Sequence, residues 1–290
     1  MRGRLAVAVL LITASLPSHP TRAAQQPSFS SRTLAVRVDV LVTDGRTPVA
    51  GLTAQDFELR DNGVAQAVAL VDASDVPINV VLALDTSASI AGKRQTDLVN
   101  ASQAILDGLK PADRAALTSF SHAVVPRVEL TSNFPSVRDE LARITPSGET
   151  AIMDGVYVAL TTTLAESGRS LVVVYTDGAD TQSWLTADEV LESAKRSSAV
   201  VYAVAATDAT HLSPLEDLVD ATGGRLLRIA STRDLRGAFE KILQDFRSRY
   251  ILAYTPTGVA LGGFHRLDVR VTRRGLNVRA RPGYVGLESK

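Results

Sequence analysis

The stretch INVVLALDTSASI, residues 78–90, decides the fold that we predict for this chain. Six of the seven residues from Ile78 to Leu84 are apolar, which is typical of a strand buried on both faces of a parallel sheet. The run then ends in an acid and three hydroxyls, in the segment 85–89. Open α/β sheets bind ligands beyond the carboxyl ends of their strands, so this ending predicts a binding site there.

The pattern of this stretch recurs through the middle of the chain. Further apolar runs lie at 115–120, 123–130, 170–176, 199–207 and 225–230. Between the runs, apolar residues keep helical spacing, as Leu98, Ala101, Ile105 and Leu109 do. The alternation predicts an α/β fold, a doubly wound and mostly parallel sheet covered by helices on both faces.

The two flanks of this region carry the period-two pattern of half-buried strands. Val36, Val38, Val40 and Val42 alternate with other residues, and similar runs lie near 250–254, 267–271 and 276–279. Residues 57–71 read as a hairpin around a turn at 61–63. Neither flank is large enough to form a core alone. We therefore expect one small β-sandwich with the central domain inserted, the alternative being two separate small sheets on that domain.

The first 23 residues are typical of a secretory signal peptide. Arg2 and Arg4 precede an apolar run from Leu5 to Leu16, and small residues precede a cleavage site after Ala23. The apolar run is too short to span a bilayer, although an N-terminal anchor or a buried helix is the alternative. We expect an exported chain, periplasmic or extracellular, with no transmembrane segment after the signal.

These patterns divide the chain into four predicted parts. The signal peptide takes 1–23, and a linker with the N-terminal β segment takes 24–76. The inserted domain takes 77–247, and the C-terminal β segment takes 248–290.

Composition excludes several classes of function. Lys and Arg total 31, as do Asp and Glu, so no basic excess indicates nucleic-acid binding. The absence of cysteine excludes disulfides, thiolate metal sites and a cysteine nucleophile. The four histidines are scattered and support neither a zinc site nor a catalytic triad.

A set of oxygen-bearing side chains is predicted to meet at one edge of the sheet. Asp85 and Asp177 each follow an apolar strand, and Thr150 lies in a loop before a predicted helix. Together with Ser87 and Ser89, they offer only oxygen, which suits Mg²⁺, Mn²⁺ or Ca²⁺ rather than Zn²⁺. Taken singly, each could be a helix cap or a turn residue. The combination favours a metal site.

This set resembles the metal-ion-dependent adhesion site of von Willebrand factor type A domains. In that family an Asp-x-Ser-x-Ser loop, a Thr from a second loop and an Asp from a third surround one divalent ion. Asp85, Ser87 and Ser89 match the first element, Thr150 the second and Asp177 the third. The resemblance covers roughly residues 77–247 and implies that a partner protein supplies a Glu or Asp carboxylate as the final ligand.

The flanks resemble those of a bacterial exported subfamily described as von Willebrand factor A-related. The matching segments are VRVDVLVTDGRTPVAGLTAQDFELRDNG (36–63), SRYILAYTP (248–256) and GFHRLDVRVTRRGLNVRARPGY (263–284). Two positions depart from the family pattern. Ala88 replaces a frequent Gly, and Glu149 replaces a small residue, adding a carboxylate that could tighten metal binding or occupy the partner's place.

We interpret the chain as a binding module and not an enzyme, recognising a protein through a divalent cation, Mg²⁺ by preference. Glu149 and Trp184 are candidates for a partner-contact rim. One alternative is a Mg²⁺-dependent phosphohydrolase, but such an enzyme needs a second acid where Ser87 stands. The other is a structural envelope protein with a vestigial metal site.

Overall fold

The computed structural model describes residues 35–164 and 166–286 of the chain. The predicted signal peptide and the beginning of the predicted linker lie outside the described residues, and the predicted domain boundaries stay predictions. No helix in the described part is long and apolar enough to cross a membrane.

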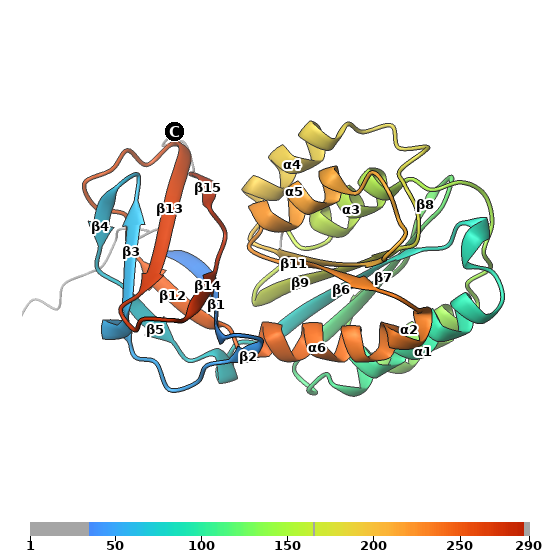
Figure 1. The fold of residues 1–290 in the computed structure, drawn as a ribbon, viewed down its shortest axis with the longest axis horizontal. Helices are drawn as coiled ribbons and strands as arrows, with labels where there is room; N and C mark the ends of the chain where they lie inside the picture. The colour runs from blue at the N-terminus through green and yellow to red at the C-terminus, as the bar shows by residue number, and fades with distance from the viewer. Residues whose placement is uncertain (1–34, 165, 287–290) are drawn as a thin grey trace, which may run out of the picture. The chain divides into compact units, whose positions relative to one another are not determined.

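A mixed sheet forms the centre of the inserted domain (Figure 1). Its strands follow the order β11 (Arg225–Ile229), β10 (Val200–Ala206), β9 (Arg169–Thr176), β6 (Ile78–Asp85), β7 (Arg114–Phe120) and β8 (Val124–Thr131). All neighbours are parallel except β7 and β8. Every residue of β6 and of β9 is buried, which explains their unbroken apolar runs. These two strands are adjacent, with Leu84 opposite Tyr175, so they end at the same edge.

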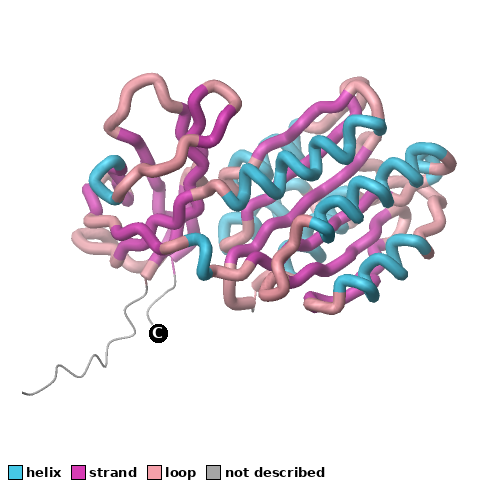
Figure 2. Tube along the Cα trace, turned by 90° about the horizontal axis from the view of Figure 1, so that it is seen from below, coloured by secondary structure: helices cyan, strands magenta, loops and turns pink. Residues whose placement is uncertain are grey.

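Helices cover both faces of this sheet, as Figures 1 and 2 show. One face packs against α1 (Lys93–Asp107), α2 (Phe134–Ala142) and α6 (Leu235–Arg247). The other packs against α3 (Ile152–Thr161), α4 (Ala187–Arg196) and α5 (Ser213–Ala221). Side chains of β6 alternate between the two cores, Leu82 joining the first and Val81 the second. The doubly wound fold class predicted from the sequence is confirmed.

Strands from both flanks form two further sheets around a core of their own. The first contains β14 (Asn277–Arg279), β1 (Val36–Asp44), β12 (Tyr250–Tyr254) and β5 (Ala69–Val71), with β2 (Thr47–Pro48) beside β1. The second contains β15 (Gly283–Gly286), β13 (Gly263–Val271), β3 (Phe57–Asp61) and β4 (Val64–Gln66). Val38 pairs with Leu252, so the two flanks share one sheet. The alternative of two separate small sheets is therefore wrong.

Buried arginines join the sandwich to the inserted domain. Arg249 is 1% exposed, and it donates to the Tyr202 hydroxyl at 2.9 Å and to the carbonyls of Gly223 at 2.5 Å and Asp39 at 3.2 Å. Arg169 forms an ion pair with the Asp39 carboxylate. The strand that returns to the sandwich is thus fixed to the central sheet by hydrogen bonds made in a buried environment.

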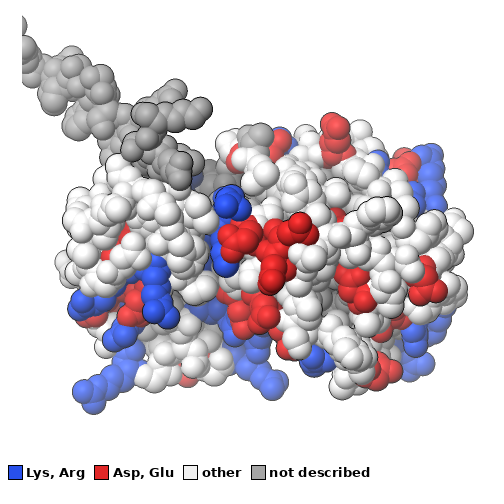
Figure 3. All heavy atoms as spheres, turned by 90° about the horizontal axis from the view of Figure 1, so that it is seen from above, with Lys and Arg blue, Asp and Glu red and all other residues white. Residues whose placement is uncertain are grey.

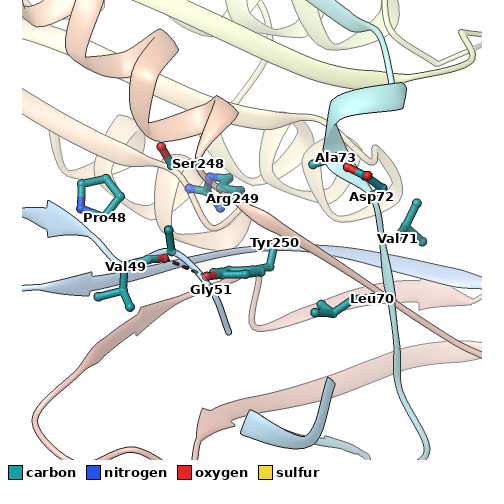
Figure 4. Close-up of a pocket in the computed structure, with 11 residues that line it drawn as sticks. Pro48, Val49, Gly51, Leu70, Val71, Asp72, Ala73, Ser248, Arg249 and Tyr250 are labelled. Atoms are coloured by element: carbon teal, nitrogen blue, oxygen red, sulfur yellow. Dashed lines mark hydrogen bonds between the residues drawn. The ribbon is translucent and has the colours of Figure 1, made fainter. Parts of the chain in front are cut away.

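A cavity of about 500 Å³ lies beside this junction (Figure 4). Ala73 and Ser248, from the two segments that connect the sandwich to the inserted domain, both line it. The Tyr250 hydroxyl donates to the Val49 carbonyl at its edge, at 2.9 Å. Ala73 precedes β6, so this cavity lies at the opposite end of that strand from Asp85 and is not part of the predicted site.

The face that α3, α4 and α5 cover is seen from above in Figure 3. Acidic side chains gather near the middle of this view beside basic ones, and most of the remaining visible surface is uncharged.

Candidate metal centre

Asp85 is the last residue of β6, and its side chain is buried with 0% exposure. One carboxylate oxygen accepts from the Ser87 backbone N–H at 2.9 Å, and the other accepts from the Thr176 hydroxyl at 2.7 Å. Burial raises the pKa of Asp85, while these hydrogen bonds oppose the rise. Among the described residues, no lysine or arginine forms an ion pair with this carboxylate. Asp85 is therefore a buried acid without a charged partner.

The hydroxyls of Ser87 and Ser89 lie between the Asp85 loop and Asp177, the second acid of the predicted site. The Ser87 and Ser89 hydroxyl oxygens lie 3.1 Å apart, and the Ser89 hydroxyl donates to Asp177 Oδ1 at 2.7 Å. Ser87 precedes a short 3₁₀ turn, Ala88–Ile90, but its side chain does not cap that turn. The structure thus brings Asp85, Ser87, Ser89 and Asp177 together, and the capping role that could have explained Ser87 is absent.

Asp177 follows the end of β9, and its side chain is 4% exposed. Its second carboxylate oxygen, Oδ2, accepts from Arg94 Nη1 at 2.6 Å. Both oxygens of this acid therefore have partners, one neutral and one cationic.

Thr150 lies in a loop that is fastened to the Asp85 loop by backbone hydrogen bonds. Ser147 N donates to the Thr86 carbonyl at 2.8 Å, and Ala88 N donates to the Gly148 carbonyl at 3.0 Å. Thr150 is buried, and Ala151 is the N-cap of α3, so Thr150 does not cap this helix. Among the described residues, none is hydrogen-bonded to the Thr150 hydroxyl. That oxygen remains available as a ligand.

Glycine is required within the Thr150 loop. Gly148 has a φ of +74°, and a Cβ built on it would lie 2.1 Å from His122 Nδ1. Any other residue would be strained and would push against this side chain. Glycine at this position therefore lets the loop lie beside the Asp85 loop without backbone strain.

The spacing and chemistry of these oxygens fit a hard divalent cation. Neighbouring side-chain oxygens along the Ser87–Ser89–Asp177 path lie 3.1 and 2.7 Å apart. Ligands at the usual Mg–O distance on an octahedron are separated by about 2.9 Å. No group of three or more His, Cys, Asp or Glu that could hold a metal occurs in the described part of the chain. A cation here would rely on two carboxylates, with hydroxyls and water as the other ligands.

The two predicted rim residues are both exposed. Glu149 is exposed beside Thr150, and Trp184 is 94% exposed. The Asp154 carboxylate accepts from the backbone N–H groups of Trp184 at 3.0 Å and Leu185 at 2.9 Å. Asp180 accepts from Met153 N at 2.8 Å. The loop that carries Trp184 is thus fastened to the start of α3, while its indole points into solvent.

Sequence reasoning missed four residues of this region. From the sequence, Asp154 and Asp180 are explained as acids of a helix start or of solvated turns, Thr176 is the end of an apolar run, and Arg94 is assigned no role. The one available signal was Arg94 itself, because a cation in the first turn of a helix is unfavourable unless a specific partner holds it.

The comparisons with known proteins agree with the fold described above. The model of the von Willebrand factor type A domain matches residues 79–241. A von Willebrand factor type A protein from Catenulispora acidiphila is 12% identical, covering 89% of this chain and 75% of its own, with a TM-score of 0.53. The minor pilin PilB from Streptococcus sanguinis, in a mutant structure, is 12% identical, covering 60% and 62%, with a TM-score of 0.51.

A third similar structure holds a metal. Proximal thread matrix protein 1 from the mussel byssus, with a zinc-occupied MIDAS motif, is 18% identical, with a TM-score of 0.54. The match covers 64% of this chain but only 49% of the mussel protein, about half its length. At these identities the likeness shows the fold alone. The family match spans more than half of the chain, and on that ground this chain belongs to the von Willebrand factor type A domain family.

Proposed function

We propose that this chain binds a partner protein through a divalent cation held by Asp85, Ser87, Ser89, Thr150 and Asp177. The observation that carries the proposal is that the buried Asp85 carboxylate, which has no cationic partner among the described residues, accepts from the Ser87 backbone N–H, while a path of hydroxyls runs from Ser87 through Ser89 to the Asp177 carboxylate. Removing such a charge from water is costly, and a bound cation offsets that cost. Type A domains typically mediate protein–protein interaction, which supports this use of the site.

Each residue has a distinct part in the proposed site. Asp85 and Asp177 formally neutralise a dication, whereas Ser87, Ser89 and Thr150 are neutral and weak donors. A bound Mg²⁺ would stay electrophilic and keep exchangeable water, which an acidic side chain of the partner can replace. Mg²⁺ is the proposed ion, because every side-chain donor is oxygen. The proposed setting is the periplasm or the extracellular space, because residues 1–23 are predicted to be a signal peptide.

A phosphohydrolase is less well supported by the geometry. Ser87 stands where a second acid would be needed, and its hydroxyl contacts Ser89. A proton donor for a leaving group is therefore lacking at that position. Domains of this family are generally adhesion or structural modules and not enzymes.

Added Mg²⁺ is expected to stabilise the wild-type protein against heat, and Asp85→Asn is expected to remove that effect. Free Mg²⁺ at 100 times its dissociation constant should add about 2.7 kcal/mol, or roughly 5–10 °C in Tm. Differential scanning calorimetry with Mg²⁺ or EDTA measures both proteins. Asp85→Asn keeps the size of the side chain, so a loss of response without a loss of folding reports on the site.

A vestigial site would give a different result. In that case the Tm of neither wild type nor Asp85→Asn would change with Mg²⁺ or Mn²⁺ concentration, and the proposed function would be wrong. Capture of a protein from the native envelope should in turn require both Mg²⁺ and Asp85. Capture that survives EDTA would contradict the proposed role of the metal.

Trp184→Ala is expected to weaken partner binding at least about tenfold without changing Mg²⁺ affinity. The indole is exposed while its backbone is held by Asp154, so little ordering is required when it packs against a partner. Isothermal titration with Mg²⁺ measures the metal affinity, and capture of a protein from the native envelope measures partner binding. Phe264→Ala is a matched control, since Phe264 is 51% exposed but lies on β13 of the sandwich. Equal losses in the two variants would remove Trp184 from the contact surface.

A further inference from the structure

Arg94 brings a positive charge to one of the proposed metal ligands. Its Nη1 donates to Asp177 Oδ2 at 2.6 Å and lies 3.4 Å from the Ser89 carbonyl oxygen. The arginine side chain is 51% exposed, whereas Asp177 is 4% exposed. A half-exposed guanidinium thus reaches from the surface to an acid of the site whose side chain is almost fully buried.

The position of Arg94 makes this contact unusual. Arg94 is the second residue of α1, and the first turn of that helix contains no acid. The amino end of a helix carries partial positive charge, so a cation there is disfavoured. Lys93 pairs with Asp97 on its own helix at 3.0 Å, whereas Arg94 reaches across 83 residues to Asp177. The Asp177 carboxylate is the group that compensates for this placement.

We propose that Arg94 is a built-in competitor of the divalent cation, one that weakens metal binding so that the site fills only when divalent ions are plentiful. This inference rests on the proposed function. Arg94 occupies Asp177 Oδ2 and neutralises one of the two negative charges that a dication would otherwise balance. A dication at the site and the guanidinium would repel each other across the same carboxylate. Because the arginine side chain is half exposed, it can turn into solvent without disturbing the core.

The proposal is tested by titrating Mn²⁺ and Mg²⁺ into wild type, Arg94→Gln and Lys93→Gln by isothermal titration calorimetry. Arg94→Gln removes the charge and is expected to tighten binding about tenfold, the effect of one unit charge facing a dication near a surface. Lys93→Gln removes a charge one residue away that does not contact Asp177, and its dissociation constant should stay within about twofold of wild type. Arg94→Lys keeps the charge and should remain near wild type.

A second measurement distinguishes competition from simple damage. Without metal, Arg94→Gln should have a slightly lower Tm than wild type, because Asp177 loses its cation. With Mg²⁺, its Tm should rise by more than that of wild type. A purely structural residue would lower the Tm without metal but would not increase the rise in Tm that Mg²⁺ causes.

Each outcome of the titration is decisive. If Arg94→Gln binds Mn²⁺ no more tightly than wild type, or if Lys93→Gln tightens binding equally, Arg94 is not a competitor, although the metal site stands. If neither wild type nor Arg94→Gln binds either ion while both are folded, the proposed function fails and the competition fails with it.

Discussion

Arg249→Ala is expected to lower the free energy of unfolding by about 3–5 kcal/mol. The guanidinium is 1% exposed and donates to two backbone carbonyls and to the Tyr202 hydroxyl. Its planar group also lies over the Tyr202 ring, 5.4 Å from the centroid. Alanine would leave buried acceptors without donors and would open a cavity between β12 and the central sheet.

Urea denaturation followed by far-UV circular dichroism measures this effect. Tryptophan fluorescence is a poor probe here, because Trp184 is already exposed in the folded protein. Arg236→Ala is the matched control. That arginine pairs with Glu240 on the surface of α6, so its loss should cost less than about 0.5 kcal/mol. A loss below about 1 kcal/mol for Arg249→Ala would show that the junction does not depend on this side chain.

Asp61→Ala is expected to destabilise the sandwich by a similar amount, about 3–5 kcal/mol. Asp61 is fully buried and accepts from His265 Nδ1 at 2.8 Å, from the Tyr254 hydroxyl at 2.8 Å and from the Tyr284 hydroxyl at 3.2 Å. Burial raises the pKa of Tyr254, so its hydroxyl stays protonated and keeps donating. Alanine would strand several buried donors in the core at once.

The same denaturation experiment applies to Asp61, with Asp268→Ala as its control. Asp268 lies on β13 opposite Arg60, and its side chain is 43% exposed. Its replacement should change stability by less than about 0.5 kcal/mol. The free energy of unfolding of Asp61→Asn should lie between those of Asp61→Ala and Asp268→Ala, because the amide oxygen keeps one hydrogen-bond acceptor at this position. Equal stability of Asp61→Ala and Asp268→Ala would show that the buried cluster contributes nothing.

The fold was predictable because its signals are local and repeated. A buried parallel strand such as β6 needs apolar side chains on both faces, and this leaves a readable run in the sequence. The meeting of Asp85 with Asp177 follows from the same logic, since adjacent parallel strands end at one edge. To predict the sheet and the meeting of the two acids, it is enough to recognise buried parallel strands and to locate the residues at which they end.

Contacts between distant side chains were not predictable in this way. Asp61 precedes Asn62 and Gly63, whose φ values are +46° and +84°, and the predicted turn is there. Nothing in that turn pattern indicates that Asp61 faces inward to meet His265, a residue 204 positions later. The pairing of Arg94 with Asp177 is hidden for the same reason. Strand and helix patterns determine which face a residue occupies, but not which distant side chain it meets there.

The pairing of β1 with β12 also has a mechanical consequence. Both described ends of the chain lie in the sandwich, and the β1–β12 ladder joins the flanks directly. Tension applied between those ends would pass through the pairings of β1 with β12 and with β14 and would leave the inserted domain outside the force path. Tension applied instead at the metal edge would have to travel through α6, β6 and the Arg249 junction. The same protein should therefore resist pulling very differently according to where it is held.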